Sequence, residues 1–288
     1  MAVDARDLDR DLAGLDALEA HAVEAKSRWV RIWAALWPKL AAIGLVLAFW
    51  QVVVWSHWRP PYVLPPPGRV LREFFGQLGT PRFHTALWIT LRRALVGYSL
   101  AVVIGGALGL AVSRVRLLRT AVGSLITGLQ TMPSIAWFPL AILFFRLSES
   151  AILFVVVLGA APSIANGLIN GVDHVPPLLL RAGRSMGASG ISLYRSVILP
   201  AALPATVAGL KQGWAFAWRS LMAGELLVIV AHRPSIGVEL QTAREFSDSP
   251  ALMATMLVIL IIGMVVDSLF GRADAALRRR WGLIDPAT

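Results

Sequence analysis

Long runs without a charged side chain constrain this sequence more than any other feature. The stretch from Ala94 to Val112 has nineteen such residues, and the stretch from Thr120 to Phe145 is uncharged throughout. A helix needs about 20 apolar residues to cross the hydrocarbon core of a bilayer. The runs therefore predict an all-α polytopic membrane protein with six transmembrane helices, at about residues 38–56, 86–112, 120–145, 150–172, 201–230 and 250–267.

The charge of the chain fits this membrane assignment. The formal net charge is +10, but only 15% of the residues are charged, and the Arg side chains flank the apolar runs. Cytoplasmic loops of membrane proteins collect Lys and Arg, so we attribute the basic balance to topology and expect no nucleic-acid partner. The chain has no cysteine, which excludes disulfides, thiolate metal sites and Cys nucleophiles.

The distribution of Lys and Arg also predicts the orientation. With the N-terminus in the cytoplasm, thirteen Lys and Arg residues lie near the cytoplasmic ends of the spans and seven lie near the outer ends. Together with six spans, this asymmetry predicts that both termini and the loop at about 173–200 are cytoplasmic. The first 25 residues are charged and carry no apolar core, so no cleavable signal peptide is expected.

Two regions are predicted along the chain. Residues 1–35 are expected to form a cytoplasmic amphipathic helix and an interfacial segment, because leucines recur on one helical face and Trp alternates with Lys and Arg after them. This helix either packs on its own protein or docks on a partner subunit. Residues 36–284 form the transmembrane domain.

Glycine and proline residues predict how the spans pack. Gly105 and Gly109 are four residues apart, a spacing that lets another helix approach closely. Pro133 and Pro139 lie inside the third span and are expected to kink or break it. Such breaks are tolerated at membrane depth where they are buried or line a cavity.

The polar loop at about 173–200 carries a pattern that occurs in serine hydrolases. Residues Gly183 to Gly187 read Gly-Arg-Ser-Met-Gly, which matches G-x-S-x-G with Ser185 as the nucleophile. That motif needs a preceding strand and a nearby His and acid, whereas here it follows two prolines and three leucines. No G-x-x-x-x-G-K-S/T motif occurs in the chain, so the chain itself is expected to hold no ATP.

The spacing within the same loop forms a longer pattern. Ala182 is followed by Gly187, and nine residues later the chain reads Val-Ile-Leu-Pro, ending at Pro200. This resembles the EAA signature of the inner-membrane permease subunits of ATP-binding-cassette (ABC) importers: Glu-Ala-Ala, three residues, Gly, nine residues, Ile-x-Leu-Pro. Here Arg, Gly and Val replace the Glu, the second Ala and the Ile. The predicted ATPase-coupling residues are Arg181, Ala182, Gly183, Gly187, Val197, Leu199 and Pro200.

The resemblance extends over about residues 60–284 and points to the nitrate, sulfonate, taurine and bicarbonate branch of these permeases. Residues Thr90–Tyr98 resemble the entry of that branch's second span. Residues Met132–Leu140 resemble its third-span Pro-x-x-Ala-x-x-Pro-Leu pattern, and Ala243–Phe246 and the Trp281-Gly282 end fit as well.

The resemblance implies a type I ABC importer permease fold in a bacterial-type plasma membrane. It also implies the partners: a second permease in a homodimer, two ABC ATPase subunits that bind ATP and Mg²⁺, and an extracytoplasmic binding protein. The loop would form a coupling helix seated on the ATPase, and its movement would switch the path between its two open states. The chain itself would hold no cofactor, and its substrate would be a small oxyanion or organosulfonate.

Charged residues inside the fifth span are candidates for the translocation path. Lys211 and Arg219 are eight residues apart and share about one helix face, whereas Glu225 lies about 120° away from Arg219. Ionisable residues in a span face a partner or an aqueous path, so these cations either attract an anion or form internal ion pairs. The candidate path residues are Arg219, Lys211, Glu225, Arg92, Met132 and Trp137, with Arg93 beside Arg92.

Two other kinds of protein stay open on the sequence. A membrane-embedded serine hydrolase would use Ser185. A stand-alone channel or secondary transporter would need no ATPase. The substrate itself cannot be named from the sequence, because in ABC importers the binding protein sets much of the specificity.

Overall fold

The computed structural model describes residues 28–281, and every regular element in that range is a helix. The chain divides into two compact units, residues 1–59 and 60–288, which are described separately. The predicted amphipathic helix within residues 1–35 lies largely outside the described residues.

The first unit contains helix α2, Arg28–Trp55. Its segment Leu36–Trp55 is long and apolar enough to span a membrane, and no part of that segment is buried within the protein. Helix α2 runs through residues 35 and 36, the predicted limit between the N-terminal region and the transmembrane domain.

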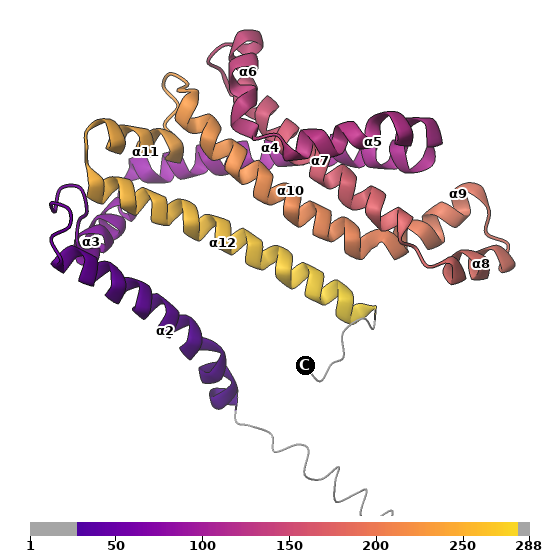
Figure 1. The fold of residues 1–288 in the computed structure, drawn as a ribbon, viewed down its shortest axis with the longest axis horizontal. Coiled ribbons are helices and arrows are strands. Elements are labelled where there is room, and N and C mark those ends of the chain that lie inside the picture. The colour runs from indigo at the N-terminus through magenta and orange to yellow at the C-terminus, as the bar shows by residue number, and fades with distance from the viewer. Residues whose placement is uncertain (1–27, 282–288) are drawn as a thin grey trace, which may run out of the picture. The chain divides into compact units, whose positions relative to one another are not determined.

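The second unit holds the remaining elements, shown in Figure 1. In chain order they are α3 (Pro67–Leu78), α4 (Pro81–Arg114), α5 (Arg116–Thr131), the 3₁₀ turn η1 (Ser134–Trp137), α6 (Phe138–Phe145), α7 (Glu149–Asp173), α8 (Pro177–Ser185), α9 (Gly190–Leu193), the π-helical turn η2 (Tyr194–Ile198), α10 (Leu199–Leu227), α11 (Ile236–Glu245) and α12 (Ser249–Arg280).

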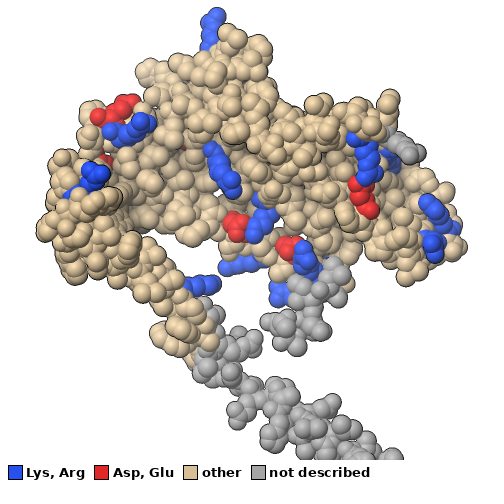
Figure 2. Space-filling model, viewed as in Figure 1, with Lys and Arg blue, Asp and Glu red and all other residues tan. Residues whose placement is uncertain are grey.

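The described helices confirm the predicted number of spans. Five are long and apolar enough to cross a membrane, and α5 with η1 and α6 makes a sixth when this bent pair counts as one span. Helices α4 and α12 extend beyond the predicted limits of 86–112 and 250–267, because polar turns continue them outside the apolar stretch. Most of the face in Figure 2 is uncharged, and Lys, Arg, Asp and Glu occur in small groups.

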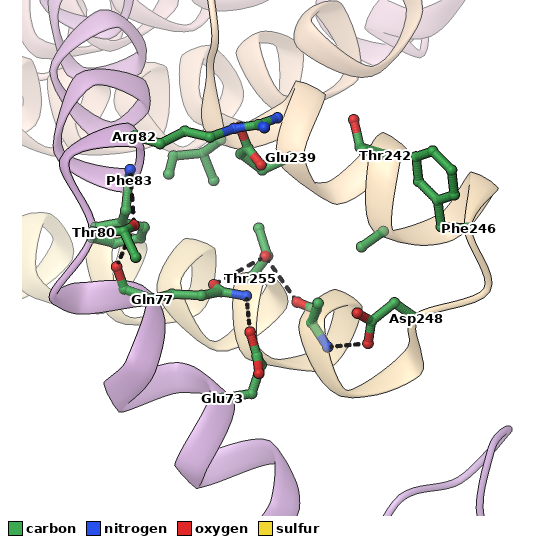
Figure 3. A pocket seen from close by; sticks show the side chains of 13 residues that line it. Glu73, Gln77, Thr80, Arg82, Phe83, Glu239, Thr242, Phe246, Asp248 and Thr255 are labelled. Carbon is green, nitrogen blue, oxygen red and sulfur yellow. Dashed lines mark hydrogen bonds and ion pairs between the residues drawn. The ribbon is translucent and has the colours of Figure 1, made fainter.

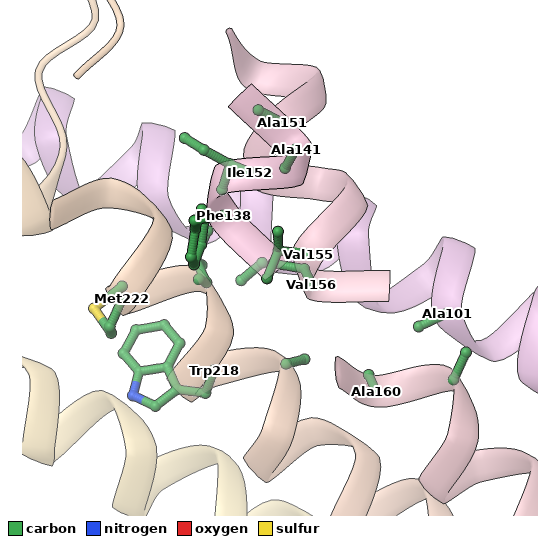
Figure 4. Packing of buried hydrophobic residues seen from close by; sticks show 14 of the residues in the cluster. Ala101, Phe138, Ala141, Ala151, Ile152, Val155, Val156, Ala160, Trp218 and Met222 are labelled. Atoms are coloured by element: carbon green, nitrogen blue, oxygen red, sulfur yellow. The ribbon is translucent and has the colours of Figure 1, made fainter. Parts of the chain in front are cut away.

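Helix α7 is the centre of the second unit and packs along both α4 and α10. Its membrane-spanning window is 61% buried, far more than that of the other spans. The main cluster of buried residues joins α4, α6, α7 and α10, as Figure 4 shows around Phe138, Val155, Val156 and Trp218. Within a bilayer, close van der Waals packing of this kind drives helix association, because lipid tails are as apolar as the side chains.

The predicted close approach at Gly105 and Gly109 is confirmed. A Cβ atom at Gly105 would lie 2.5 Å from the carbonyl oxygen of Ala161 on α7, and one at Gly109 would lie 3.0 Å from that of Ala165. Helices α7 and α10 also cross backbone to backbone, where a Cβ atom at Gly167 would meet the Cα atom of Gly209 at 2.5 Å.

The third span is broken, as its prolines predict. Helices α5 and α6 meet at an angle of 104° across residues 132 and 133. Met132 is extended, the conformation favoured by a residue that precedes proline. Pro133 therefore lies at the break, whereas Pro139 lies in the first turn of α6, where no N–H donor is needed.

Candidate functional site: the coupling loop and a cavity at the broken span

The polar loop folds into a short hairpin of helices at the end of the molecule away from α3 and α11 (Figure 1). Helix α8 begins at Pro177 and ends in a left-handed turn at Gly187 with φ +85°. The Ala188 N–H donates to the Gly183 carbonyl and the Gly187 N–H to that of Arg184, both at 3.0 Å. This is the Schellman arrangement, which glycine adopts without strain.

Gly183 fixes how the hairpin closes. It is buried, and a Cβ atom there would lie 2.9 Å from side-chain carbons of both Leu193 and Val197. The second half of the EAA-like pattern therefore packs directly on the first half. The nine-residue spacing between Gly187 and Val197 gives the chain enough length to turn back.

Three large apolar side chains of this hairpin are exposed among polar ones. Leu178, Met186 and Ile191 are 74%, 80% and 72% exposed. Arg181 and Ala182 are exposed beside them, whereas Leu199 and Pro200 are half-buried where α10 begins. Large apolar side chains that are exposed together are typical of surfaces that contact another protein or the membrane.

The hydrolase pattern has no catalytic geometry. Ser185 is the last residue of α8, so a helix precedes it in place of the strand that a nucleophile turn requires. The residue is exposed on the loop surface. We therefore assign no chemistry to Ser185.

Glu225 forms a buried charge cluster with α4. Its carboxylate accepts hydrogen bonds from the Thr90 hydroxyl at 2.9 Å, from the Arg93 guanidinium at 3.0 Å and from the Gly237 N–H at 3.0 Å. Glu225 is fully buried, and Arg93 is 3% exposed. The carboxylate is thus neutralised and shielded within the subunit, and it does not reach a path.

Glu149 at the start of α7 extends this cluster to the surface. It lies 3.4 Å from both Arg92 and Arg93 and 3.3 Å from Arg233. Ion pairs therefore connect the first half of α4, the start of α7, the end of α10 and the segment before α11. Arg92, a candidate path residue, belongs to this ion network.

Lys211 also has a partner. Its Nζ atom lies 3.1 Å from Oδ1 of Asp267 on α12. Both side chains lie on the outside of the subunit, where they link α10 to α12. Of the two cations on this face of α10, only Arg219 has no carboxylate within 4 Å among the described residues.

Arg219 lies at a cavity beside the broken span. The cavity has a volume of about 240 Å³, and its lining combines α5, η1, α7 and α10. The Arg219 guanidinium carbon is 5.4 Å from the ring centroid of Phe216. The lining residues are Leu129, Gln130, Thr131, Met132, Pro133, Ser134, Ile135, Trp137, Leu158, Gly159, Phe216 and Arg219. The structure thus brings together Arg219, Met132 and Trp137 of the candidate path residues, and places Lys211, Glu225 and Arg92 elsewhere.

Gln130 is a lining residue that the sequence analysis missed. Its amide donates to the Ser163 hydroxyl at 3.1 Å and accepts from the Asn166 amide at 3.0 Å. These two partners on α7 fix the orientation of Gln130 at the cavity. A polar amide side chain in an otherwise apolar span is a sequence signal. This signal could have indicated Gln130 and Asn166.

A second cavity lies at the start of α4, between α3, α11 and α12 (Figure 3). It has a volume of about 360 Å³. Its acidic lining residues are Glu73, Glu239 and Asp248, and its one lining cation, Arg82, pairs with Glu239 at 2.7 Å. Acids therefore outnumber bases in this cavity, whereas the charged residue that lines the cavity beside the broken span is Arg219.

Comparison with known proteins identifies the family. Residues 101–282, more than half of the sequence, match the model of the binding-protein-dependent transport system inner membrane component. The chain belongs to this family. Its members are permease components of ABC importers and not enzymes, since ATP hydrolysis is carried by separate subunits. The chain is accordingly a multi-pass protein of the plasma membrane.

Similar permeases include proteins with named substrates. The chain is 30% identical over 258 residues to the putative aliphatic sulfonates transport permease protein SsuC of Escherichia coli K12, covering 87% of this chain and 92% of that protein. It is 29% identical over 233 residues to the taurine transport system permease protein TauC of the same organism, covering 79% and 84%.

Solved structures confirm the fold. An inward-facing structure of the MetNI methionine ABC transporter matches with a TM-score of 0.59 and 20% identity, covering 68% of this chain and 96% of that chain. An amino acid ABC transporter matches with a TM-score of 0.53 and 18% identity, covering 69% and 94%. The permease therefore has the type I importer fold that the resemblance implied.

Proposed function

We propose that this permease subunit carries a small anion, an organosulfonate such as taurine or another sulfonate, or an oxyanion such as nitrate. The observation that carries the proposal is the Arg219 guanidinium at the cavity beside the broken span, with no carboxylate within 4 Å in residues 28–281. A cation inside a span is costly and is kept where it meets a partner or a path. The planar N–H donors of the Arg219 guanidinium fit the oxygens of sulfonate and nitrate, as they fit those of a carboxylate.

The walls of the cavity favour an organic anion. Ile135, Trp137, Leu158 and Phe216 supply apolar surface, and Gln130 supplies a fixed amide beside the cation. A sulfonate with a short carbon chain would place its charge on Arg219 and its carbons on these side chains. Relatives named for aliphatic sulfonates, taurine and nitrate support an anionic substrate.

We further propose that ATP hydrolysis in partner subunits drives the transport. The exposed apolar surface of the α8–α9 hairpin supports docking on an ATPase. In this proposal two copies of the permease form a homodimer, two ABC ATPases bind ATP with Mg²⁺, and a binding protein delivers the anion. The permease itself holds no cofactor and contacts no nucleic acid.

The test is uptake into vesicles that contain the permease, its ATPase and its binding protein. We expect Arg219→Ala to lower uptake by about tenfold or more, since a charge-assisted hydrogen bond contributes about 1.5–3 kcal/mol. Arg219→Lys should retain part of the uptake. Lys211→Ala is the matched control, because Lys211 lies on the same helix and is already paired with Asp267.

Two outcomes would contradict the proposal. Normal uptake by Arg219→Ala would remove Arg219 from the path. Uptake by the permease in vesicles without any ATPase would show a channel or secondary transporter. The substrate within the anion class is identified by mass spectrometry of the ligand that co-purifies with the binding protein.

A further inference from the structure

The π-helical turn η2 is joined to the end of α4. The Tyr194 hydroxyl and the Ser113 hydroxyl lie 2.6 Å apart. The Arg114 guanidinium carbon lies 4.4 Å from the centroid of the Tyr194 ring, as a cation–π contact. These two contacts fix Tyr194 at the point where the α8–α9 hairpin continues into α10. Single π-helical turns are rare and occur frequently at functional sites.

A cavity of about 410 Å³ opens beside Tyr194. Its apolar lining comes from the last turns of α4, from the start of α10 and from α9, and its cations are Arg114 and Arg195. Both arginines are exposed, and neither has a carboxylate within 4 Å among residues 28–281. The lining residues are Leu110, Ala111, Arg114, Ile191, Tyr194, Arg195 and Leu199.

The place of this cavity in the bilayer follows from the helices that form it. Helix α4 ends at Arg114 and α10 begins at Leu199, so the cavity lies where two spans leave the hydrocarbon core. Cations at such positions lie in the headgroup layer, with apolar side chains just below them. The Lys and Arg distribution predicts that this is the cytoplasmic side.

We propose that this cavity binds the headgroup of an anionic phospholipid. The phosphate lies between the guanidinium groups of Arg114 and Arg195, and the acyl chains follow Leu110 and Leu199 toward the membrane. Basic pockets between transmembrane helices on the cytoplasmic side are suited to anionic headgroups. A free phosphate ion would leave the apolar half of the cavity facing water, so a lipid fits the lining better.

Binding of the lipid would affect η2, the turn that connects the α8–α9 hairpin to α10. A lipid phosphate that contacts both arginines connects α4 to η2, next to the Tyr194–Ser113 contact. We therefore expect the importer to work faster in anionic membranes. This consequence rests on the proposed coupling role of the hairpin, whereas the binding itself does not.

The direct test measures lipid retention by the full-length permease in mixed micelles of phosphatidylglycerol and phosphatidylcholine, using native mass spectrometry. We expect selective retention of phosphatidylglycerol, and a loss of about a hundredfold or more in the R114Q/R195Q variant, because two charge-assisted contacts are removed. The R114K/R195K variant keeps both charges and should retain the lipid, even if the glutamine variant fails to fold. Arg279→Gln, an exposed arginine in the last turn of α12, should have no effect.

Three results would overturn the inference. If Arg279→Gln lost as much phosphatidylglycerol as R114Q/R195Q, retention would reflect general attraction between a basic protein and anionic lipid. Displacement of phosphatidylglycerol by millimolar inorganic phosphate would show a site for free anions. Displacement by the purified ATPase would assign the two arginines to subunit docking. Because no transport is measured in this test, its result is independent of the anion path at Arg219.

Discussion

At the scale of single residues, Glu225 has the most demanding environment in the described part of the chain. A fully buried carboxylate is costly unless it is neutralised and hydrogen-bonded. Thr90, Arg93 and the Gly237 backbone supply these contacts from α4 and from the start of α11. One side chain therefore joins α10 to α11, which follows it closely in sequence, and to α4, which lies 132 or more residues away.

Glu225→Ala should destabilise the permease strongly. The substitution leaves Arg93 buried with only its longer contact to Glu149, and breaking such a pair costs about 3–5 kcal/mol. The melting temperature of the purified protein in detergent should fall accordingly. Glu239→Ala is the control, because its pair with Arg82 is exposed and contributes about 0–1 kcal/mol. Equal melting temperatures for the two variants would refute a stabilising role for Glu225.

At the scale of structural elements, the α8–α9 hairpin and the broken third span carry the functional features. The hairpin closes on the buried Gly183 and presents Leu178, Met186 and Ile191 outward. The break at Pro133 opens the cavity at which Arg219 lies. In the hairpin, Gly183 sets the backbone direction because it has no Cβ atom. In the broken span, Pro133 sets it because it has no N–H donor.

Gly187→Trp tests the hairpin as a docking element. No atom of the described residues lies within 4 Å of a Cβ atom at Gly187, so apart from backbone strain a bulky side chain there acts on a partner. We expect it to reduce ATPase co-purification, or transport per ATP hydrolysed, by about tenfold. Gly187→Asn is the matched control, since any L-residue is strained at φ +85° but Asn tolerates this region best. Unchanged docking and transport in Gly187→Trp would show that the partner binds elsewhere.

At the scale of the whole molecule, the two ends of the second unit differ in character. The end with α3 and α11 carries a net acidic cavity, whereas the end with α8 and α9 carries the exposed hairpin and the cavity of Arg114 and Arg195. Figure 1 shows these elements at opposite ends of α10. The sequence predicts that the hairpin end faces the cytoplasm.

This orientation can be measured directly, because the chain contains no cysteine. We expect Ser185→Cys to react with a membrane-impermeant maleimide only after cells are permeabilised, and Phe246→Cys to react in intact cells. Both residues are exposed and lie at opposite ends of the molecule. Labelling of Ser185→Cys in intact cells would reverse the predicted topology.

The sequence by itself determined the helical class, the number of spans, the break at Pro133 and the close approach at Gly105. Each of these depends on local properties: the length of an apolar run, the missing N–H of proline and the missing Cβ of glycine.

Only the tertiary structure decided which charged residues are free. Arg93 and Glu225 are 132 residues apart, and no periodicity connects them. Thr90 and Arg93 do share a face of α4, but that spacing does not reveal the acid they contact. Glu225, Arg92 and Lys211 form ion pairs within the subunit. Arg219 is unpaired among the described residues and lies at the cavity of the broken span. Charge pairing between spans depends on how helices pack, and packing is a property of the folded chain.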